Sequence, residues 1–424
     1  MPAVPSSLIK HLAGKPPGQV IEGVAAGGLL EALEQLPDPR GRFGRRYPLV
    51  CIVALAVCAI ACNADGFTAI HQWACDLSED QLARLGGGKR HRHTGRVLVP
   101  AEKTIRSLIC RIDPAVLLEV VGRYATHRLE QAGMPKVPAH VAKEREARRR
   151  AKARAARATR RLRGIAGDGK TLKGSGKDRY ERAHLLAIIE HDGRHVIARI
   201  KVDGKTNEVP ALRDHLAGRD LDGAVLSVDA LHTCVESAQA IVDAGGHYLM
   251  CVKHNTPALH AKLVAALVTD EDFTDSSISW RQIGHGRDER RYLRVAPAPE
   301  DLDFPAAAQV TLTIRRRAAR VRGTVSYSKE YVFAITDLTV QQAGPADLAL
   351  AQQDHWSSES RHHVLDVTFH EDYCRARTGH AAENLSTLRD LAIDTYAWEG
   401  HANNAHARRH YTNDKERILA VHNV

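Results

Sequence analysis

The sequence lacks the patterns that would indicate a structural zinc site or a membrane anchor. Its eight cysteines form no CxxC pair and no CxxC…HxxxH pattern, which argues against a zinc finger or ribbon. The longest apolar run, Leu49–Cys62, has 14 residues and is too short to span a bilayer. The N-terminal residues show no long apolar core and no signal-type cleavage site. We therefore expect a reducing, cytosolic protein in which Leu49–Cys62 is a buried helix.

Acidic residues are too few to balance the basic ones. Lys and Arg number 60 against 50 Asp and Glu in 424 residues, which gives a formal net charge of +10. Hydrophobic residues make up 44%, enough for a sizeable core in about two or three domains. The positive excess favours a polyanionic partner such as a nucleic acid, and the alternative is a basic protein with no special partner.

Apolar residues at helical spacing predict a small all-helical domain over residues 30–133. It opens with a short amphipathic stretch at Leu29–Leu36, and Pro114 suits the first turn of its last helix. The longer predicted helices are Leu49–Cys62, Ala69–Leu77, Glu79–Leu85, Glu102–Cys110 and Pro114–Ala132.

A strongly basic segment follows this domain. Eleven of the 21 residues in Lys143–Arg163 are Lys or Arg, and most of the others are Ala, a strong helix former. The segment has no apolar stripe to bury, so it is either a solvated linker or a helix ordered by nucleic-acid phosphates. Under the second interpretation its candidate DNA-binding residues are Arg148, Arg149, Arg150 and Arg154.

The next region alternates predicted strands and helices, and two of the strands end in aspartate. A short strand ends at Asp168, and a buried strand within Gly223–Leu231 ends at Asp229. The order is strand, strand, strand, helix, strand, helix, strand, helix, which predicts an α/β (α+β) mixed sheet with flanking helices, as in a ribonuclease-H-like core. The first and fourth strands are neighbours in that fold, so the two carboxylates can converge. The other predicted elements are the strands His184–Glu190, His195–Val202 and His247–Lys253 and the helices Glu208–Leu216, Val235–Asp243 and Pro257–Leu267.

Residues 272–339 are β-like and rich in arginine, and Arg287 follows His-Gly in a predicted turn. We expect a β-rich insertion that lies outside the mixed sheet. Its charged strands suit either a surface for backbone phosphates or an ordinary half-solvated sheet.

A polar helix face is predicted beyond the insertion. Spacings of four, seven and eleven residues place Glu359, His362 and Asp366 on the same face as His355. Such a face is costly to bury unless it meets a metal ion or a charged ligand. Together with Asp168 and Asp229, this helix would supply carboxylates from three elements, which is a donor set for Mg²⁺ or Mn²⁺.

Several motifs occur in order along residues 30–420, among them GDGKTLKGS, KVDGKTNEVPAL, VDALHT, HWSSES and LDVTFHEDYCRARTGHA. With them the sequence resembles insertion-sequence transposases of the DDE class, in the branch of the H-repeat-associated proteins. The resemblance implies an acidic triad of Asp168, Asp229 and Glu359. Glu371 and Asp372 in FHED form a competing pair for the third acid.

The resemblance also implies a function: cleavage and rejoining of DNA strands with two Mg²⁺ ions, for which Mn²⁺ can substitute, held by the triad. Lys170, Lys253, His355 and Arg287 are candidates for contacts with DNA phosphates. The expected partners are the terminal inverted repeats of the protein's own element and a second copy of the chain on DNA, in the bacterial cytoplasm at the nucleoid. The alternatives are a catalytically decayed or repurposed DNA-binding protein and a structure-specific nuclease with the same core.

Changes in composition divide the chain into six predicted regions. These are a variable N-terminal segment (1–29), the helical domain (30–133), a basic helical linker (134–163), the first part of the catalytic core (164–271), the β-rich insertion (272–345), and the final core helix with a C-terminal helical tail (346–424).

Overall fold

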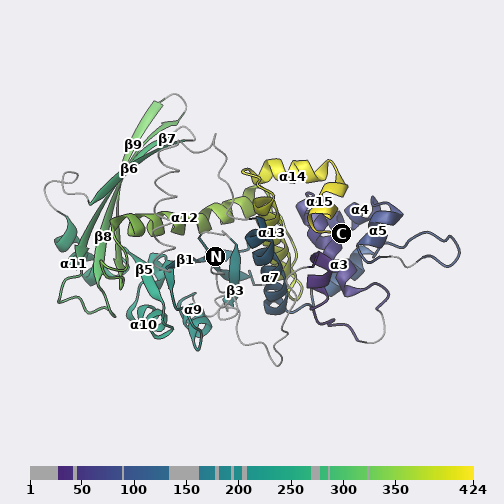
Figure 1. Cartoon of the computed structure of the whole chain (residues 1–424), viewed down its shortest axis with the longest axis horizontal. Coiled ribbons are helices and arrows are strands. Elements are labelled where there is room, and N and C mark those ends of the chain that lie inside the picture. Colours follow the sequence, from purple (N-terminus) through teal and green to yellow (C-terminus); the bar gives the residue numbers. More distant parts are fainter. Residues whose placement is uncertain are drawn as a thin grey trace.

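The computed structural model combines a helical unit with a large sheet, and one long helix runs between them (Figure 1). The structure describes residues 27–41, 45–87, 90–132, 162–176, 181–191, 195–202, 208–268, 277–284, 287–321 and 324–424. Within these ranges no helix is both long and apolar enough to cross a bilayer. The eight cysteines are free thiols.

The helical unit forms around α3 (Leu49–Ala61), which is almost entirely apolar and is buried at every position except Val50. A helix that is hydrophobic on all sides must be surrounded by other elements. The elements packed with it confirm the predicted helices to within about two residues, except that the first is shorter than expected. They are α2 (Leu29–Leu33), α4 (Phe67–Cys75), α5 (Glu79–Arg84), α6 (Glu102–Ile109) and α7 (Pro114–Ala132).

The C-terminal helices complete this unit. Helix α13 (Ala381–Trp398) is buried along most of its length and packs on both α7 and α3. Helices α14 (Asn404–Thr412) and α15 (Lys415–Val421) join the same hydrophobic core. The sequence predicted a C-terminal helical tail after the final core helix, and the apolar faces of α13–α15 are buried against the N-terminal helices.

The strands form a single nine-stranded sheet in the order β3-β2-β1-β4-β5-β9-β8-β7-β6. Strand β1 pairs antiparallel with β2 and parallel with β4, and β4 pairs parallel with β5. The order of the first five strands confirms the expected ribonuclease-H-like mixed sheet. The strands are β1 (Arg163–Thr171), β2 (His184–Glu190), β3 (Val196–Val202), β4 (Ala224–Val228), β5 (His247–Val252), β6 (Ile278–Gly284), β7 (Arg287–Pro297), β8 (Gln309–Val321) and β9 (Thr324–Thr336).

The β-rich segment was predicted correctly as strands but wrongly as lying outside the sheet. Strand β9 pairs antiparallel with β5, and β8, β7 and β6 extend the sheet beyond it. Without β9, the edge of β5 would expose unpaired backbone groups, and the pairing satisfies them. Arg287 is the first residue of β7 rather than a turn residue.

Helices cover the two faces of this sheet. Helices α9 (Glu208–Leu216), α10 (Val235–Asp243) and α11 (Pro257–Leu267) bury apolar side chains in one core with β1, β4 and β5. Helix α12 (Pro345–Val367) packs against β1, β4 and β7.

The basic segment is described only at its end. Arg163 opens β1 and forms an ion pair with Glu190, so the helical linker does not reach residue 163 as predicted. Arg148, Arg149, Arg150 and Arg154 lie outside the described residues.

Candidate active site

The two aspartates lie at the centre of the sheet, on neighbouring parallel strands. Gly167 of β1 is in register with Val228 of β4, so Asp168 and Asp229 follow side by side. Asp168 lies within β1, which runs on to Thr171, rather than at the end of the strand as the sequence predicted. Asp229 follows β4 directly and caps the 3₁₀-helix η2 (Ala230–His232) by accepting a hydrogen bond from the Ala230 N–H.

Helix α12 faces Asp168 with Ser358 and His362, which lie one turn apart on one side of the helix. His362 Nδ1 is 3.3 Å from Asp168 Oδ2. Burial raises the pKa of Asp168, but the hydrogen bonds from His362 and Ser358 and the nearby imidazoles of His362 and His355 outweigh that effect. The pKa of Asp168 is therefore lowered, and the carboxylate is ionised at neutral pH.

His355 of α12 is the residue that connects the three predicted acids. Its imidazole is partly buried, and its Nδ1 lies 3.1 Å from Ser227 Oγ on β4. Burial lowers the pKa of His355 more than the charges of Asp168, Asp229 and Glu359 raise it. The imidazole is thus uncharged at neutral pH and interacts electrostatically with all three carboxylates, although these come from different elements.

Asp229 also has a basic neighbour on the adjacent strand end. Lys253, just after β5, places Nζ 3.1 Å from Asp229 Oδ1, and both side chains are more than half exposed. Burial raises the pKa of Asp229, but the Ala230 N–H, Lys253 and His355 together lower it further than burial raises it. Lys253 is therefore held beside the acids while its ammonium group stays open to solvent.

The acids suit a hard divalent cation in their chemistry, because they offer carboxylate oxygens from three elements. They do not form a closed cage. Among the described residues, no three His, Cys, Asp or Glu side chains are close enough to hold a metal ion together. All three carboxylates act on the pKa of His355, and Glu359 is exposed.

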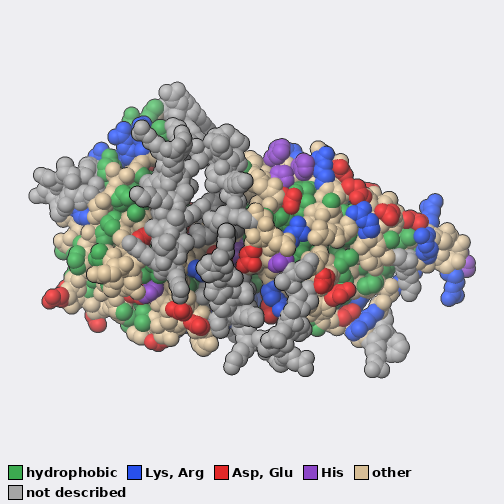
Figure 2. All heavy atoms as spheres, viewed as in Figure 1, with side chains coloured by type: hydrophobic (Ala, Val, Ile, Leu, Met, Phe, Trp, Pro, Cys, Tyr) green, Lys and Arg blue, Asp and Glu red, His purple; other side chains and the backbone are tan. Residues whose placement is uncertain are grey.

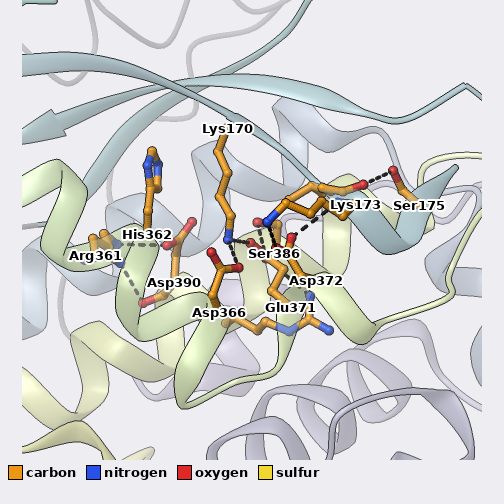
Figure 3. A network of polar contacts seen from close by, with 12 residues as sticks. Lys170, Lys173, Ser175, Arg361, His362, Asp366, Glu371, Asp372, Ser386 and Asp390 are labelled. Carbon is orange, nitrogen blue, oxygen red and sulfur yellow. Dashed lines mark hydrogen bonds and ion pairs between the residues drawn. The ribbon is translucent and has the colours of Figure 1, made fainter.

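Lys170 of β1, which was also predicted to bind phosphate, is in a different environment from Lys253. Lys170 is only 7% exposed, and its Nζ contacts Asp366 Oδ1 at 2.5 Å and Glu371 Oε2 at 2.7 Å. Figure 3 shows the side chain reaching from β1 down to these two carboxylates. These two ion pairs argue against the predicted contact of Lys170 with DNA.

Both alternative third acids are paired with basic side chains: Glu371 with Lys170 in the same network, and Asp372 with Lys173 outside it. Glu371, in the 3₁₀-helix η3 (Glu371–Tyr373), is almost fully buried and also accepts a hydrogen bond from Ser386 Oγ at 2.7 Å. Burial raises its pKa, but Arg389 and Lys170 outweigh this and lower the pKa to about 2. Asp372 pairs with Lys173 at 2.7 Å (Figure 3). Glu371 is thus engaged on both carboxylate oxygens.

Sequence reasoning missed a further carboxylate near the site, Glu208 at the start of α9. Its two oxygens contact His184 Nε2 of β2 at 2.7 Å and His232 Nε2 of η2 at 3.1 Å. Glu208 occupies the space beside Gly169, where a Cβ would lie 2.2 Å from its Oε1. Through these contacts, Glu208 connects β1 and β2 to η2, the turn that Asp229 caps. Its place in the KTNEVPAL motif was the available signal.

Trp356 packs the polar part of α12 against β7 and β8, two of the strands that extend the sheet. The guanidinium groups of Arg291 and Arg315 lie 4.3 Å and 4.8 Å from its ring centroid. Trp356 and Ser227 also line a mainly apolar pocket next to His355. Since Trp356 follows His355 and precedes Glu359, these contacts fix the part of α12 that faces the acids.

Two family models match the chain in agreement with this architecture. Residues 30–125 match the domain described as DDE_Tnp_1-associated, and residues 156–394 match the Transposase DDE domain. The chain belongs to the DDE transposases. This family is a class of DNA-binding nucleases and transposases that generally use divalent metal ions.

Individual relatives of this transposase cover most of its length. The H repeat-associated putative transposase YhhI of Escherichia coli (strain K12) is 26% identical over 380 residues, 86% of this chain and 89% of the relative. The putative transposase YncI of Escherichia coli O157:H7 is 26% identical over 381 residues and 86% of each chain. The transposase therefore belongs to the H-repeat-associated branch, as its motifs indicated.

Proposed function

We propose that this transposase cleaves and rejoins DNA strands at the ends of its own insertion sequence by metal-dependent phosphoryl transfer. The observation that carries the proposal is geometric: Asp168 on β1 and Asp229 after β4 lie on neighbouring parallel strands, and α12, which carries Glu359, packs against both strands. The charges of all three carboxylates act on His355 of the same helix. Carboxylates from separate elements that face one polar centre are typical of a site for hard cations.

In this proposal Asp168, Asp229 and Glu359 hold two Mg²⁺ ions, for which Mn²⁺ can substitute. When bound, the pair would lower the pKa of the attacking water or 3′-hydroxyl and neutralise the charge on the leaving oxygen. Glu371 and Asp372 take no part, because their carboxylates are engaged with Lys170, Ser386 and Lys173.

The remaining side chains bind and orient. His362 donates to Asp168 and fixes the direction of its carboxylate, and the contact of Nδ1 with Ser227 Oγ fixes the direction of the His355 ring. Lys253, beside Asp229 and open to solvent, binds a phosphate oxygen of the scissile strand. The uncharged His355 accepts the proton of the attacking water or 3′-hydroxyl and returns it to the leaving oxygen.

The partners in this proposal are the terminal inverted repeats of the element and a second copy of the chain, since two DNA ends must meet. The helical unit and the basic segment before β1 hold the ends. Support comes from the net charge of +10 and from the match of residues 30–125 to a domain associated with this transposase family.

The test compares wild type with Asp168→Asn and Asp229→Asn on a duplex that carries the flanking inverted repeat. We expect each variant to lose strand cleavage in Mg²⁺ and in Mn²⁺ and to keep nearly the wild-type affinity for the duplex. The reason is that carboxylates bind the metal while Lys and Arg bind the phosphates. Cleavage by either variant at near the wild-type rate would refute the assignment. Binding without cleavage by the wild-type protein would support the alternative of a decayed transposase.

A further inference from the structure

Four basic residues lie in one straight row across the strands that extend the sheet. Arg281 of β6 is in register with Arg290 of β7, Arg290 with Arg316 of β8, and Arg316 with Lys329 of β9. Residues directly opposite each other in antiparallel strands point to the same face. All four side chains are exposed. We call these four residues the cation row.

The cation row lies on the sheet face away from α12. Side chains alternate along a strand, so Arg290 and Arg316 point opposite to their neighbours Arg291 and Arg315. The guanidinium groups of Arg291 and Arg315 lie over the ring of Trp356 on α12. The cation row is therefore separated from the three acids by the thickness of the sheet. Lys and Arg side chains are visible at this end of the molecule in Figure 2.

The rows on either side carry little opposing charge. One consists of Ser279, Tyr292, Ile314 and Tyr331, and the other of Ile283, Asp288, Ala318 and Tyr327. Asp288 pairs with Arg281, with the Nε to Oδ1 distance at 2.7 Å. Tyr327 is 82% exposed and Tyr331 41% exposed. Tyrosine hydroxyls are suitable donors to phosphate oxygens.

Like charges placed directly opposite each other destabilise a sheet. A polyanion removes the repulsion, and each phosphate neutralised by Lys or Arg releases condensed counterions. Three gaps between neighbouring strands make the row about 14 Å long. With one phosphate per about 3.4 Å of axis on a DNA strand, this length matches roughly four phosphates.

We propose that the cation row is a second DNA-binding surface, which holds the phosphate backbone of a duplex segment other than the one at the acids. This inference rests on the proposed function, to which it adds the place of a further DNA contact. Because the row offers charge at regular spacing and the tyrosines beside it offer hydroxyl groups, this surface binds duplex DNA independently of sequence.

The experiment measures binding of a random-sequence duplex of about 30 base pairs by fluorescence anisotropy, without divalent metal, over a range of NaCl concentrations. The variant is Arg290→Gln/Arg316→Gln. The control, Arg182→Gln/Lys201→Gln, removes the same charge from exposed positions just before β2 and on β3, at the opposite end of the sheet. We expect the slope of log affinity against log salt to decrease by up to about 1.8 in the row variant, at about 0.9 per phosphate contact, and by clearly less in the control.

Thermal unfolding without DNA provides a second readout. The row variant should unfold at the wild-type temperature or above it, because the substitutions relieve repulsion. A salt slope equal to wild type, or an equal change in the control, would overturn the proposal. The proposed function is tested by a different experiment and would fail if Asp168→Asn still cleaved DNA. That outcome would not change the binding result for the cation row.

Discussion

Two polar regions lie next to each other between β1 and α12, and they differ in how their charges are paired. Asp168 faces His362, and two residues further along β1 Lys170 faces Asp366, one turn beyond His362. The first pair belongs to the candidate active site. The second belongs to the buried ion-pair network, which we define as Lys170, Asp366, Glu371, Ser386 and Arg389. The first four are labelled in Figure 3.

The difference shows that the partners of a side chain, rather than its type, separate a structural charge from a functional one. In the network, Glu371 is buried and meets Lys170, Arg389 and Ser386. In the site, Asp168 and Asp229 have a histidine and an exposed lysine as partners, which leave oxygen lone pairs open. A metal ion or a phosphate can enter the site without breaking a buried ion pair.

The largest effect on folding that we expect comes from Lys170→Met. The substitution leaves Asp366 and Glu371 without their shared cation in a buried position, and breaking a buried pair from one side costs about 3–5 kcal/mol. The free energy of unfolding from urea titration measures the loss. As a control, Lys173→Met removes an exposed partner of Asp372 and should change stability little. Equal stability of the two variants would mean that the network does not hold β1 to α12.

A smaller effect is expected from acid. The pKa of Glu371 is about 2 in the folded protein against an ordinary value of 4.5, so the unfolded chain binds a proton first as the pH falls. The stabilisation by this carboxylate is complete above pH 4.5 and is lost as the pH falls through 4.5 towards 2. A shift of this size corresponds to about 3 kcal/mol.

Urea titrations between pH 6 and pH 3 measure this loss. In Glu371→Gln the pH dependence should be shallower than in wild type, although the variant is less stable at pH 6. Parallel curves for the two proteins would show that Glu371 has no lowered pKa.

The elements with a local signal could be predicted from the sequence. Helices α7 and α11 begin and end where the apolar spacing and the prolines at their first residues indicated. The neighbouring positions of Asp168 and Asp229 followed from the order of strands and helices.

Features that depend on distant residues could not be predicted. The partners of Lys170 lie about 200 residues further along the chain, so nothing near GDGK shows that this lysine is buried. The same applies to the pairing of β9 with β5 and to the packing of α13 on α3. The spacing of apolar residues shows which face of a helix or strand will be buried. It does not show which other element will cover that face, because tertiary packing determines this.

The measurement that tests the central claim most directly compares the rates of strand cleavage by two variants, Glu359→Gln and Asp372→Asn, in Mg²⁺ and in Mn²⁺. Glu359 is exposed on α12 and interacts with His355, whereas Asp372 is paired with Lys173 away from the acids. We expect Glu359→Gln to lose at least about a hundredfold in rate, because a metal ligand contributes several kcal/mol to the transition state, and Asp372→Asn to stay within about twofold of wild type. Loss of cleavage in Asp372→Asn with activity kept in Glu359→Gln would contradict the account.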